Sequence, residues 1–232
     1  MILPPPSPGL IALITGASSG IGEHFAHQLS ARGHRVAVVA RREDLLTKLA
    51  EELGGPDRAV VVTADLSVPE DRDRLAARLE ELGAQVEVLV NNAGFGVYRS
   101  FTNSGRDAEI RQVRVLVEAP VDLMARFLLG MVKRGRGAII NMSSTAGFQA
   151  LPLNAGYAAA KAHLLLLSEA VHTEVEDQGV AVRVVAPGPV RTGFQEASDA
   201  AYFAERMPKF TFVPPERLPR THWRQRTAGA SP

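Results

Sequence analysis

The segment LIALITGASSGIG, residues 10–22, joins a short apolar run to a glycine-rich turn. Residues 10–15 have the length of a buried strand, and residues 22–32 continue with the spacing of an amphipathic helix. Gly16, Gly20 and Gly22 permit a tight turn that a ligand can approach closely, and a helix N-terminus after such a turn attracts phosphate. A plain glycine-rich turn is the alternative, but a strand before and a helix after it favour dinucleotide binding.

Segments of strand length and helix length alternate along the rest of the chain. The predicted strands occupy residues 10–15, 36–40, 59–63, 86–90, 138–142 and 180–186. They are apolar throughout, as in a parallel sheet that is covered by helices on both faces. The sequence therefore predicts an α/β protein with three layers and a doubly wound, Rossmann-like sheet of six parallel strands.

Two helices carry more specific expectations. Ser67 and Glu70 have the spacing of a capping box, which predicts a helix that starts at Ser67 and ends at Gly83. Residues 107–134 predict a long helix that Pro120 kinks or divides.

The composition excludes several classes of protein. The 232 residues are 46% hydrophobic and 22% charged, which is typical of a globular chain with a substantial core. A formal net charge of +1 provides no field for nucleic acid or an acidic membrane. The absence of cysteine excludes disulfides and fits a cytoplasmic location. The chain shows no membrane-spanning run or signal peptide, and its six histidines suggest no metal site.

Polar and glycine-rich clusters follow the predicted strands. They lie at residues 16–22, 41–42, 65, 91–94, 143–144 and 187–192. Ligands of open parallel sheets bind at the carboxyl ends of the strands, so these clusters predict one shared site.

Four motifs together resemble those of the short-chain dehydrogenase/reductase family. They are T-G-x-x-x-G-x-G at residues 15–22, N-N-A-G at 91–94, Ser144, and Y-A-A-A-K at 157–161, and the resemblance spans residues 9–195. It implies one NAD(P)-binding catalytic domain at residues 9–217, and the proline-rich start predicts a loose N-terminal arm at residues 1–8. Residues 218–232 are expected to form an irregular tail, because the family's usual seventh strand is missing and Pro219 interrupts any helix.

The resemblance implies a catalytic triad of Ser144, Tyr157 and Lys161. Tyr157 would exchange a proton with a carbonyl or alcohol, Lys161 would also hold the nicotinamide ribose, and Ser144 rather than Ser143 would bind the substrate oxygen. Tyr157 and Lys161 are four residues apart and share a helix face. A nearby ammonium is expected to lower the pKa of the tyrosine and favour its phenolate.

The resemblance also implies a cofactor site that spans most of the chain. Asp65 would meet the adenine amino group, with capping of the next helix as the alternative, and residues 91–94 would brace the sheet. The implied cofactor residues are Gly16, Ser18, Ser19, Gly20, Ile21, Gly22, Arg41, Arg42, Asp65, Leu66, Asn92, Ala93, Gly94, Tyr157, Lys161, Pro187, Gly188, Val190 and Thr192.

The end of the second strand bears on the choice of cofactor. An acidic residue there would bind the ribose 2′-hydroxyl, but the chain has Ala40 followed by Arg41 and Arg42. Arginine binds phosphate well, so we expect NADP(H) over NAD(H), with Arg41 as the main contact and Arg42 as a further one. The alternative is that the two arginines are only a solvated pair at a helix start. Ser19 also opposes NADP(H), because it stands where many NADP-preferring relatives carry a basic residue.

The substrate is expected to be a hydrophobic ketone, aldehyde or secondary alcohol. Phe95, Phe148 and Phe194 are candidate walls of an apolar pocket, although these aromatic residues could instead only bury the segment after Gly188. The partners expected are this small molecule and a second copy of the chain, in a homodimer or homotetramer, without nucleic acid or membrane.

Leu116 departs from the family pattern. Many relatives carry a catalytic asparagine at this position, and leucine cannot hydrogen-bond the water of a proton relay. The leading hypothesis is an oxidoreductase that transfers a hydride between NADP(H) and a carbonyl or secondary alcohol. The alternative is a cofactor-binding protein with weak or no turnover that acts through a protein partner.

Overall fold

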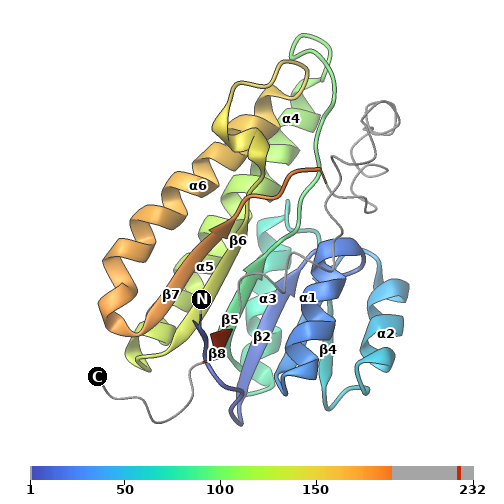
Figure 1. The fold of residues 1–232 in the computed structure, drawn as a ribbon. Helices are drawn as coiled ribbons and strands as arrows, with labels where there is room; N and C mark the ends of the chain where they lie inside the picture. Colours follow the sequence, from blue (N-terminus) through green and yellow to red (C-terminus); the bar gives the residue numbers. More distant parts are fainter. Residues whose placement is uncertain (1, 190–223, 226–232) are drawn as a thin grey trace.

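The computed structural model describes residues 2–189 and 224–225 (Figure 1). Its main sheet has six parallel strands in the order β4-β3-β2-β5-β6-β7. The strands are β2 (Leu10–Thr15), β3 (Arg35–Ala40), β4 (Ala59–Thr63), β5 (Gln85–Asn91), β6 (Gly137–Met142) and β7 (Val180–Val185). The predicted doubly wound sheet is confirmed.

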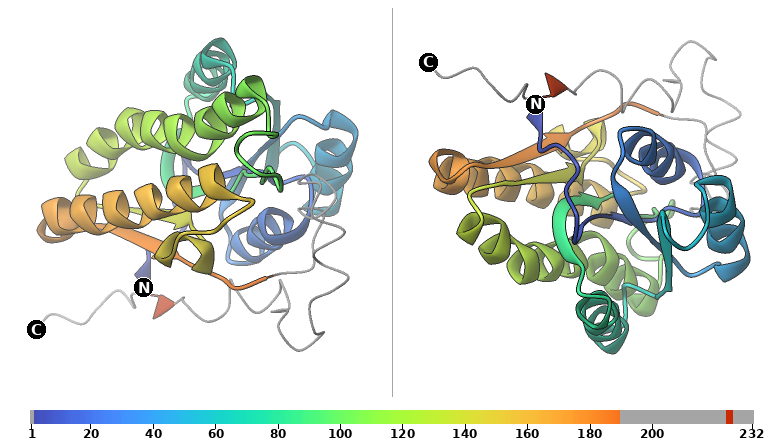
Figure 2. Two further views of the ribbon diagram at one scale, coloured as in Figure 1. Left: turned by 90° about the horizontal axis from the view of Figure 1, so that it is seen from above. Right: turned by 90° about the horizontal axis from the view of Figure 1, so that it is seen from below.

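Helices cover both faces of this sheet (Figure 2). On one face lie α1 (Gly20–Ala31) and α2 (Glu43–Glu52). On the other lie α3 (Pro69–Glu81), α5 (Ala119–Lys133) and α6 (Ala155–Val175). Two core clusters result, and successive residues of β2 alternate between them: Ile11 and Leu13 enter one, Ala12 and Ile14 the other. Burial on both faces explains why the strands are apolar without alternation.

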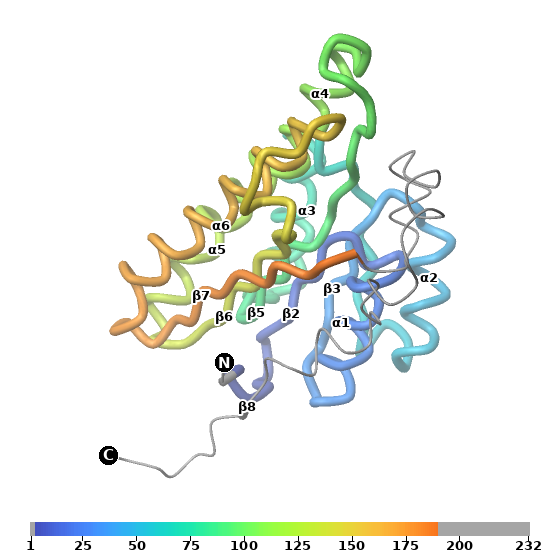
Figure 3. The backbone as a smooth tube through the Cα atoms, turned by 45° about the horizontal axis from the view of Figure 1, so that its top comes forward, coloured from blue at the N-terminus to red at the C-terminus, as the bar shows by residue number. Residues whose placement is uncertain are grey.

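The chain reverses its direction of winding between β2 and β5. It runs outward through β3 and β4, then returns to place β5 on the other side of β2, as the tube in Figure 3 shows. The loops that follow β2 and β5 therefore lie next to each other at the carboxyl edge of the sheet. This is the position where open parallel sheets bind their ligands.

The predicted capping box at Ser67 is wrong. Helix α3 begins at Pro69 with Val68 as its N-cap, and no side chain caps it. Proline is well suited to the first helical turn, because it lacks an N–H and its φ is already helical. The Ser67 hydroxyl instead donates to Asp65 Oδ1 at 2.7 Å.

The long helix predicted at residues 107–134 is divided, as expected near Pro120. It consists of α4 (Arg106–Val113), a π-helical turn η1 (Arg114–Glu118) and α5. Pro120 cannot donate to the carbonyl of Leu116, four residues earlier, and the wider turn precedes it. Short 3₁₀ turns η2 (Thr145–Phe148) and η3 (Glu176–Gln178) flank α6.

Two short strands pair near the ends of the described chain. Strand β1 (Ile2–Leu3) pairs in parallel with β8 (Arg224–Gln225), which lies within the tail that was expected to be irregular. Within the predicted arm, Leu3 is buried in the core and Arg136 Nη2 donates to the Pro5 carbonyl at 2.6 Å. An apolar side chain at the start of the arm gives it a core contact that the prolines around it do not suggest.

Candidate active site at the carboxyl edge of the sheet

The glycine-rich loop after β2 has no room for side chains at two of its glycines. Gly16 has a φ of +67°, and a methyl group on it would lie 2.8 Å from Ala93 Cα. A methyl group on Gly22 would collide with the Gly16 carbonyl oxygen. Ser19 is the N-cap of α1 but makes no capping hydrogen bond with its side chain. The first N–H groups of α1 are therefore available to an anionic ligand.

The loops after β2 and β5 are joined by hydrogen bonds. Asn92 Nδ2 donates to the Thr15 carbonyl at 3.0 Å, and Thr15 Oγ1 accepts from the backbone N–H groups of Asn92 and Ala93 at 2.9 and 3.1 Å. One strand further along, Asn91 Nδ2 donates to Asn141 Oδ1 at 2.8 Å. This network holds the glycine loop against the centre of the sheet.

Arg42 and Arg41 differ in their surroundings. Arg42 Nη2 donates to Ser18 Oγ at 2.9 Å and to Ser19 Oγ at 3.1 Å, so its guanidinium lies over the glycine loop. Arg41 is exposed and makes no hydrogen bond or ion pair to any residue that the structure describes. The arginine that faces the loop is thus the second of the pair, whereas the sequence suggested the first.

Asp65 is held by two partners. Its Oδ1 accepts from the Ser67 N–H at 3.0 Å, and its Oδ2 accepts from Arg111 Nη2 at 2.7 Å. Burial alone would raise the pKa of Asp65, but the hydrogen bonds from Ser67 and Arg111 hold it below its ordinary value. Arg111 also lies over the Phe95 ring, 5.9 Å from its centroid. Arg111 therefore contacts both Asp65, the predicted adenine contact, and Phe95, a predicted wall of the substrate pocket.

Ser144, Tyr157 and Lys161 come together at the end of β6. Ser144 lies near enough to Tyr157 to lower the pKa of its phenol, and Lys161 Nζ lies 5.6 Å from the centroid of the Tyr157 ring. Ser143 points elsewhere, because its hydroxyl donates to the Lys161 carbonyl at 2.8 Å. The geometry therefore distinguishes the two serines in the way that the family spacing does.

The expected lowering of the Tyr157 pKa is not found. Burial raises the pKa of this phenol, the nearby Ser144 side chain lowers it less, and Tyr98 raises it further. Lys161 is itself buried, which lowers its pKa to about 8, and its Nζ donates to the Met142 carbonyl at 2.6 Å. At Tyr157, the rise in pKa caused by burial is therefore larger than the lowering that the sequence led us to expect from the Lys161 ammonium.

Leu116 lies beside Tyr157 and Lys161 of the triad. A methyl group on Gly94 would lie 2.9 Å from Leu116 Cδ2 and 3.7 Å from Lys161 Nζ. Leu116 is 1% exposed and packs in one cluster with Val115, Tyr157 and Ala160. An apolar methyl group therefore borders the lysine on this side.

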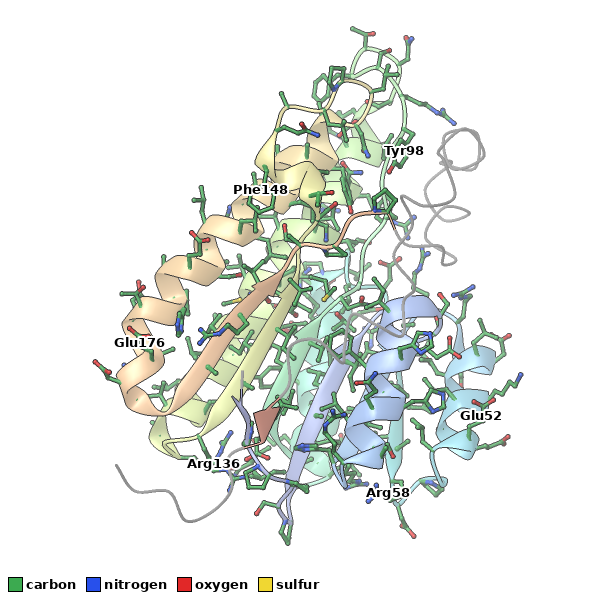
Figure 4. All side chains as sticks on the ribbon, in the orientation of Figure 1. Glu52, Arg58, Tyr98, Arg136, Phe148 and Glu176 are labelled. Carbon is green, nitrogen blue, oxygen red and sulfur yellow. The ribbon has the colours of Figure 1, made fainter. Side chains whose placement is uncertain are left out.

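The candidate substrate residues are divided between described and undescribed parts of the chain. Phe95 packs against the Leu116 cluster, whereas Phe148 is 70% exposed on η2; Figure 4 labels Phe148 and Tyr98 at the end of the molecule opposite Arg58 and Arg136. Phe194, Val190 and Thr192 lie outside the described residues.

The remaining predicted cofactor residues that the structure describes also lie at this edge. Pro187 is held there because its carbonyl accepts from the Thr145 N–H at 3.0 Å. The described cofactor residues follow the ends of β2 to β7 or occupy the first turns of α6: Gly16, Ser18, Ser19, Gly20, Ile21, Gly22, Arg41, Arg42, Asp65, Leu66, Asn92, Ala93, Gly94, Tyr157, Lys161, Pro187 and Gly188.

The sequence did not reveal two residues of this site. Arg111 is 46 positions from Asp65, and nothing in the local pattern links the two. Asn154 precedes α6 as its N-cap, a position that asparagine favours, so a helix-start signal was present.

Among residues 2–189 and 224–225, no group of three histidine, aspartate or glutamate side chains is placed to hold a metal ion. None of the described helices is long and apolar enough to cross a membrane.

Comparison with known proteins agrees with this geometry. A family model described as short chain dehydrogenase matches residues 10–202. An uncharacterized oxidoreductase of Staphylococcus epidermidis is 32% identical over 196 residues, which is 84% of this chain and 83% of the relative. A short-chain dehydrogenase from Sphingobium yanoikuyae in complex with NADPH is 31% identical with a TM-score of 0.82, over 90% of this chain and 80% of that one. A bulky-bulky ketone specific alcohol dehydrogenase from Comamonas testosteroni is 31% identical with a TM-score of 0.75, over 90% and 79%.

Proposed function

This chain belongs to the short chain dehydrogenase family of oxidoreductases, and we propose that it transfers a hydride between NADP(H) and a carbonyl or secondary alcohol. The observation that carries the proposal is the meeting of Ser144, Tyr157 and Lys161 at the carboxyl edge of the sheet, where the glycine loop also lies. The proposal is tested by following NADPH absorbance while the protein is incubated with a panel of ketones and alcohols.

The glycine loop fits a dinucleotide. Gly16 and Gly22 leave no space for a side chain, the α1 N-terminus has free N–H groups, and the Arg42 guanidinium lies over the loop. A pyrophosphate would bind the loop backbone and a 2′-phosphate would bind the guanidinium. When bound, the nicotinamide supplies or accepts the hydride.

The protein's own residues move the proton. In the direction of reduction, Ser144 holds the carbonyl oxygen while the Tyr157 hydroxyl gives its proton to it, and hydride addition at the carbonyl carbon completes the alcohol. Burial raises the pKa of Tyr157, so the phenol holds a proton at neutral pH. A protonated phenol is the form that the acid in ketone reduction requires.

Arg42→Asp is expected to lower kcat/KM for NADPH by about 10- to 100-fold and to leave the value for NADH unchanged or higher. The substitution removes a charge-assisted hydrogen bond to the 2′-phosphate, worth roughly 1.5–3 kcal/mol, and adds repulsion. Steady-state kinetics with both cofactors measures the effect.

Arg41→Asp is the matched control, because it changes the same charge at the neighbouring position. Its effect should be clearly smaller, since Arg41 does not face the loop. A larger effect at Arg41 would restore it as the main contact. Equal losses with NADPH and NADH would mean that Arg42 only supports the loop.

Leu116→Asn tests the alternative of a cofactor-binding protein with weak turnover. We expect kcat to rise or stay unchanged and the NADPH Kd to change little, because asparagine nearly matches leucine in volume and could hold water beside Lys161. A buried amide without partners would lower the free energy of unfolding by about 1–3 kcal/mol. Leu116→Met, which adds no polar group, is the control.

The size of the change in kcat decides between the two functions. A gain of more than about tenfold, equal to 1.4 kcal/mol in the barrier, would show that the natural chain turns over weakly. No turnover in either variant, with NADPH still bound, would also favour the binding-protein alternative.

A further inference from the structure

Asn154 is a buried amide whose hydrogen-bonding capacity is not used. The residue is 2% exposed, and both Oδ1 and Nδ2 are buried without a partner that meets hydrogen-bond geometry. It is the N-cap of α6, yet it makes no capping bond with its side chain. Buried polar atoms without a partner are rare and unfavourable. A buried amide whose donor Nδ2 and acceptor Oδ1 both lack a partner is therefore a candidate ligand-binding group.

The backbone just before this residue is strained. Leu153 has a φ of +68° and is the one non-glycine residue with positive φ among those that the structure describes. Its own side chain is 46% exposed, so packing of the leucine does not explain the conformation. The strain instead fixes the direction in which the chain enters α6 at Asn154, and such strain is concentrated at functional sites.

Tyr98 lies beside this amide. A methyl group on the buried Gly96 would lie 2.9 Å from Tyr98 Cε2 and 3.4 Å from both polar atoms of Asn154, so the glycine makes room for the two side chains. Burial raises the pKa of the Tyr98 phenol and the amide partly offsets that rise, although the two groups do not meet hydrogen-bond geometry. Tyr98 comes from the loop after β5, and Asn154 from the start of α6.

Both side chains lie next to the proposed acid. Asn154 is the N-cap of α6, and Tyr157 is the third residue of that helix. Tyr98 is near enough to act on the pKa of Tyr157. A group bound by the amide would therefore be only a few bonds from the oxygen that Tyr157 and Ser144 hold.

We propose that Asn154, with Tyr98 beside it, is a second polar anchor of the substrate pocket and that the substrate is a hydroxyketone or the corresponding diol. The proposal rests on the proposed oxidoreductase function and names its substrate class. A hydroxyl both donates and accepts, so it satisfies Nδ2 and Oδ1 together, whereas a carboxylate only accepts and an ammonium only donates. A purely apolar ketone would leave the amide unpaired.

Binding of matched ketones tests this proposal without turnover. The probes are acetophenone with its α-hydroxy derivative, and propiophenone with its β-hydroxy derivative, titrated by calorimetry into the full-length protein with NADP⁺ and without it. At least one hydroxylated probe should bind the wild type about 5- to 100-fold more tightly than its parent. In Asn154→Leu this ratio should fall to near one.

Two further variants and one control complete the experiment. Tyr98→Phe should reduce the ratio less than Asn154→Leu, because the amide remains. Asn154→Asp keeps the acceptor and the size of the side chain, loses the donor, and should show an intermediate ratio. Asn103→Leu changes an exposed asparagine on the same loop as Tyr98 and should leave the ratio unchanged.

The outcomes separate this proposal from the oxidoreductase function. No preference for either hydroxylated probe in the wild type, or an unchanged preference in Asn154→Leu, would overturn the anchor. If Asn154→Leu does not fold, an unchanged preference in both Asn154→Asp and Tyr98→Phe has the same meaning. A preference that Asn154 controls, with no NADPH oxidation by the bound probes, would support the anchor and contradict the proposed oxidoreductase.

Discussion

Tyr157→Phe should lower kcat by about 10²- to 10⁴-fold for ketone reduction while the NADPH Kd stays within a few-fold of wild type. Tyr157 is 8% exposed and lies beside Ser144, and phenylalanine fills the same space without a proton to give. Stopped-flow measurement of NADPH oxidation gives the rate, and fluorescence titration of NADPH gives the Kd.

The variant also provides its own control for folding. Removing a buried hydroxyl leaves the ring packed against Leu116 and Ala160, so the thermal midpoint should change little. Retention of more than about a tenth of the wild-type kcat, a barrier change below 1.4 kcal/mol, would mean that another group gives the proton. Loss of NADPH binding together with the rate would instead mean that the substitution disturbed the cofactor site.

Lys161→Met should lower both kcat and NADPH affinity by about 10-fold or more each, because its ammonium has two proposed roles. It would bind the cofactor ribose and stabilise charge at Tyr157, and methionine keeps only the length of the side chain. A measured Kd equal to that of the wild type would remove the ribose role and leave the role at Tyr157.

Burial of Lys161 also predicts a dependence of stability on pH. Its pKa is lowered to about 8 in the folded protein, whereas the unfolded chain keeps the ordinary value near 10.4. Between these values the unfolded state binds more protons, so the wild type gains stability as pH rises through this window. Below pH 8 both states are protonated, and the unfavourable burial of the charge is present in full.

Urea unfolding of the wild type and Lys161→Met at pH 7, 9 and 10 measures this linkage. The free energy of unfolding of the wild type, relative to the variant, should rise by roughly 2–3 kcal/mol from pH 7 to pH 10. Other titrating groups are shared and cancel in the difference. Parallel curves would mean that Lys161 keeps its ordinary pKa in the folded protein.

The strands and the glycine loop were predictable because their causes are local. Residues 11–14 are apolar in succession since neighbouring residues enter different cores on the two faces of the sheet. Gly16 and Gly22 are glycines because any side chain would strike backbone at the turn. Where local signals competed, the prediction failed: Ser67 had the spacing of a cap, but Pro69 two residues later set the helix start.

The sequence by itself determined the order of the elements, the edge of the sheet where the site lies and the residue types gathered there. Only the tertiary structure decided that Arg42 faces the loop, that Arg111 holds Asp65 and that Asn154 is buried beside Tyr98. It also decided the sign of the pKa shift at Tyr157, where spacing to Lys161 suggested the opposite. The physical reason is that periodicity and turn chemistry act over a few neighbouring residues. Burial and desolvation, in contrast, depend on which distant segments cover a side chain.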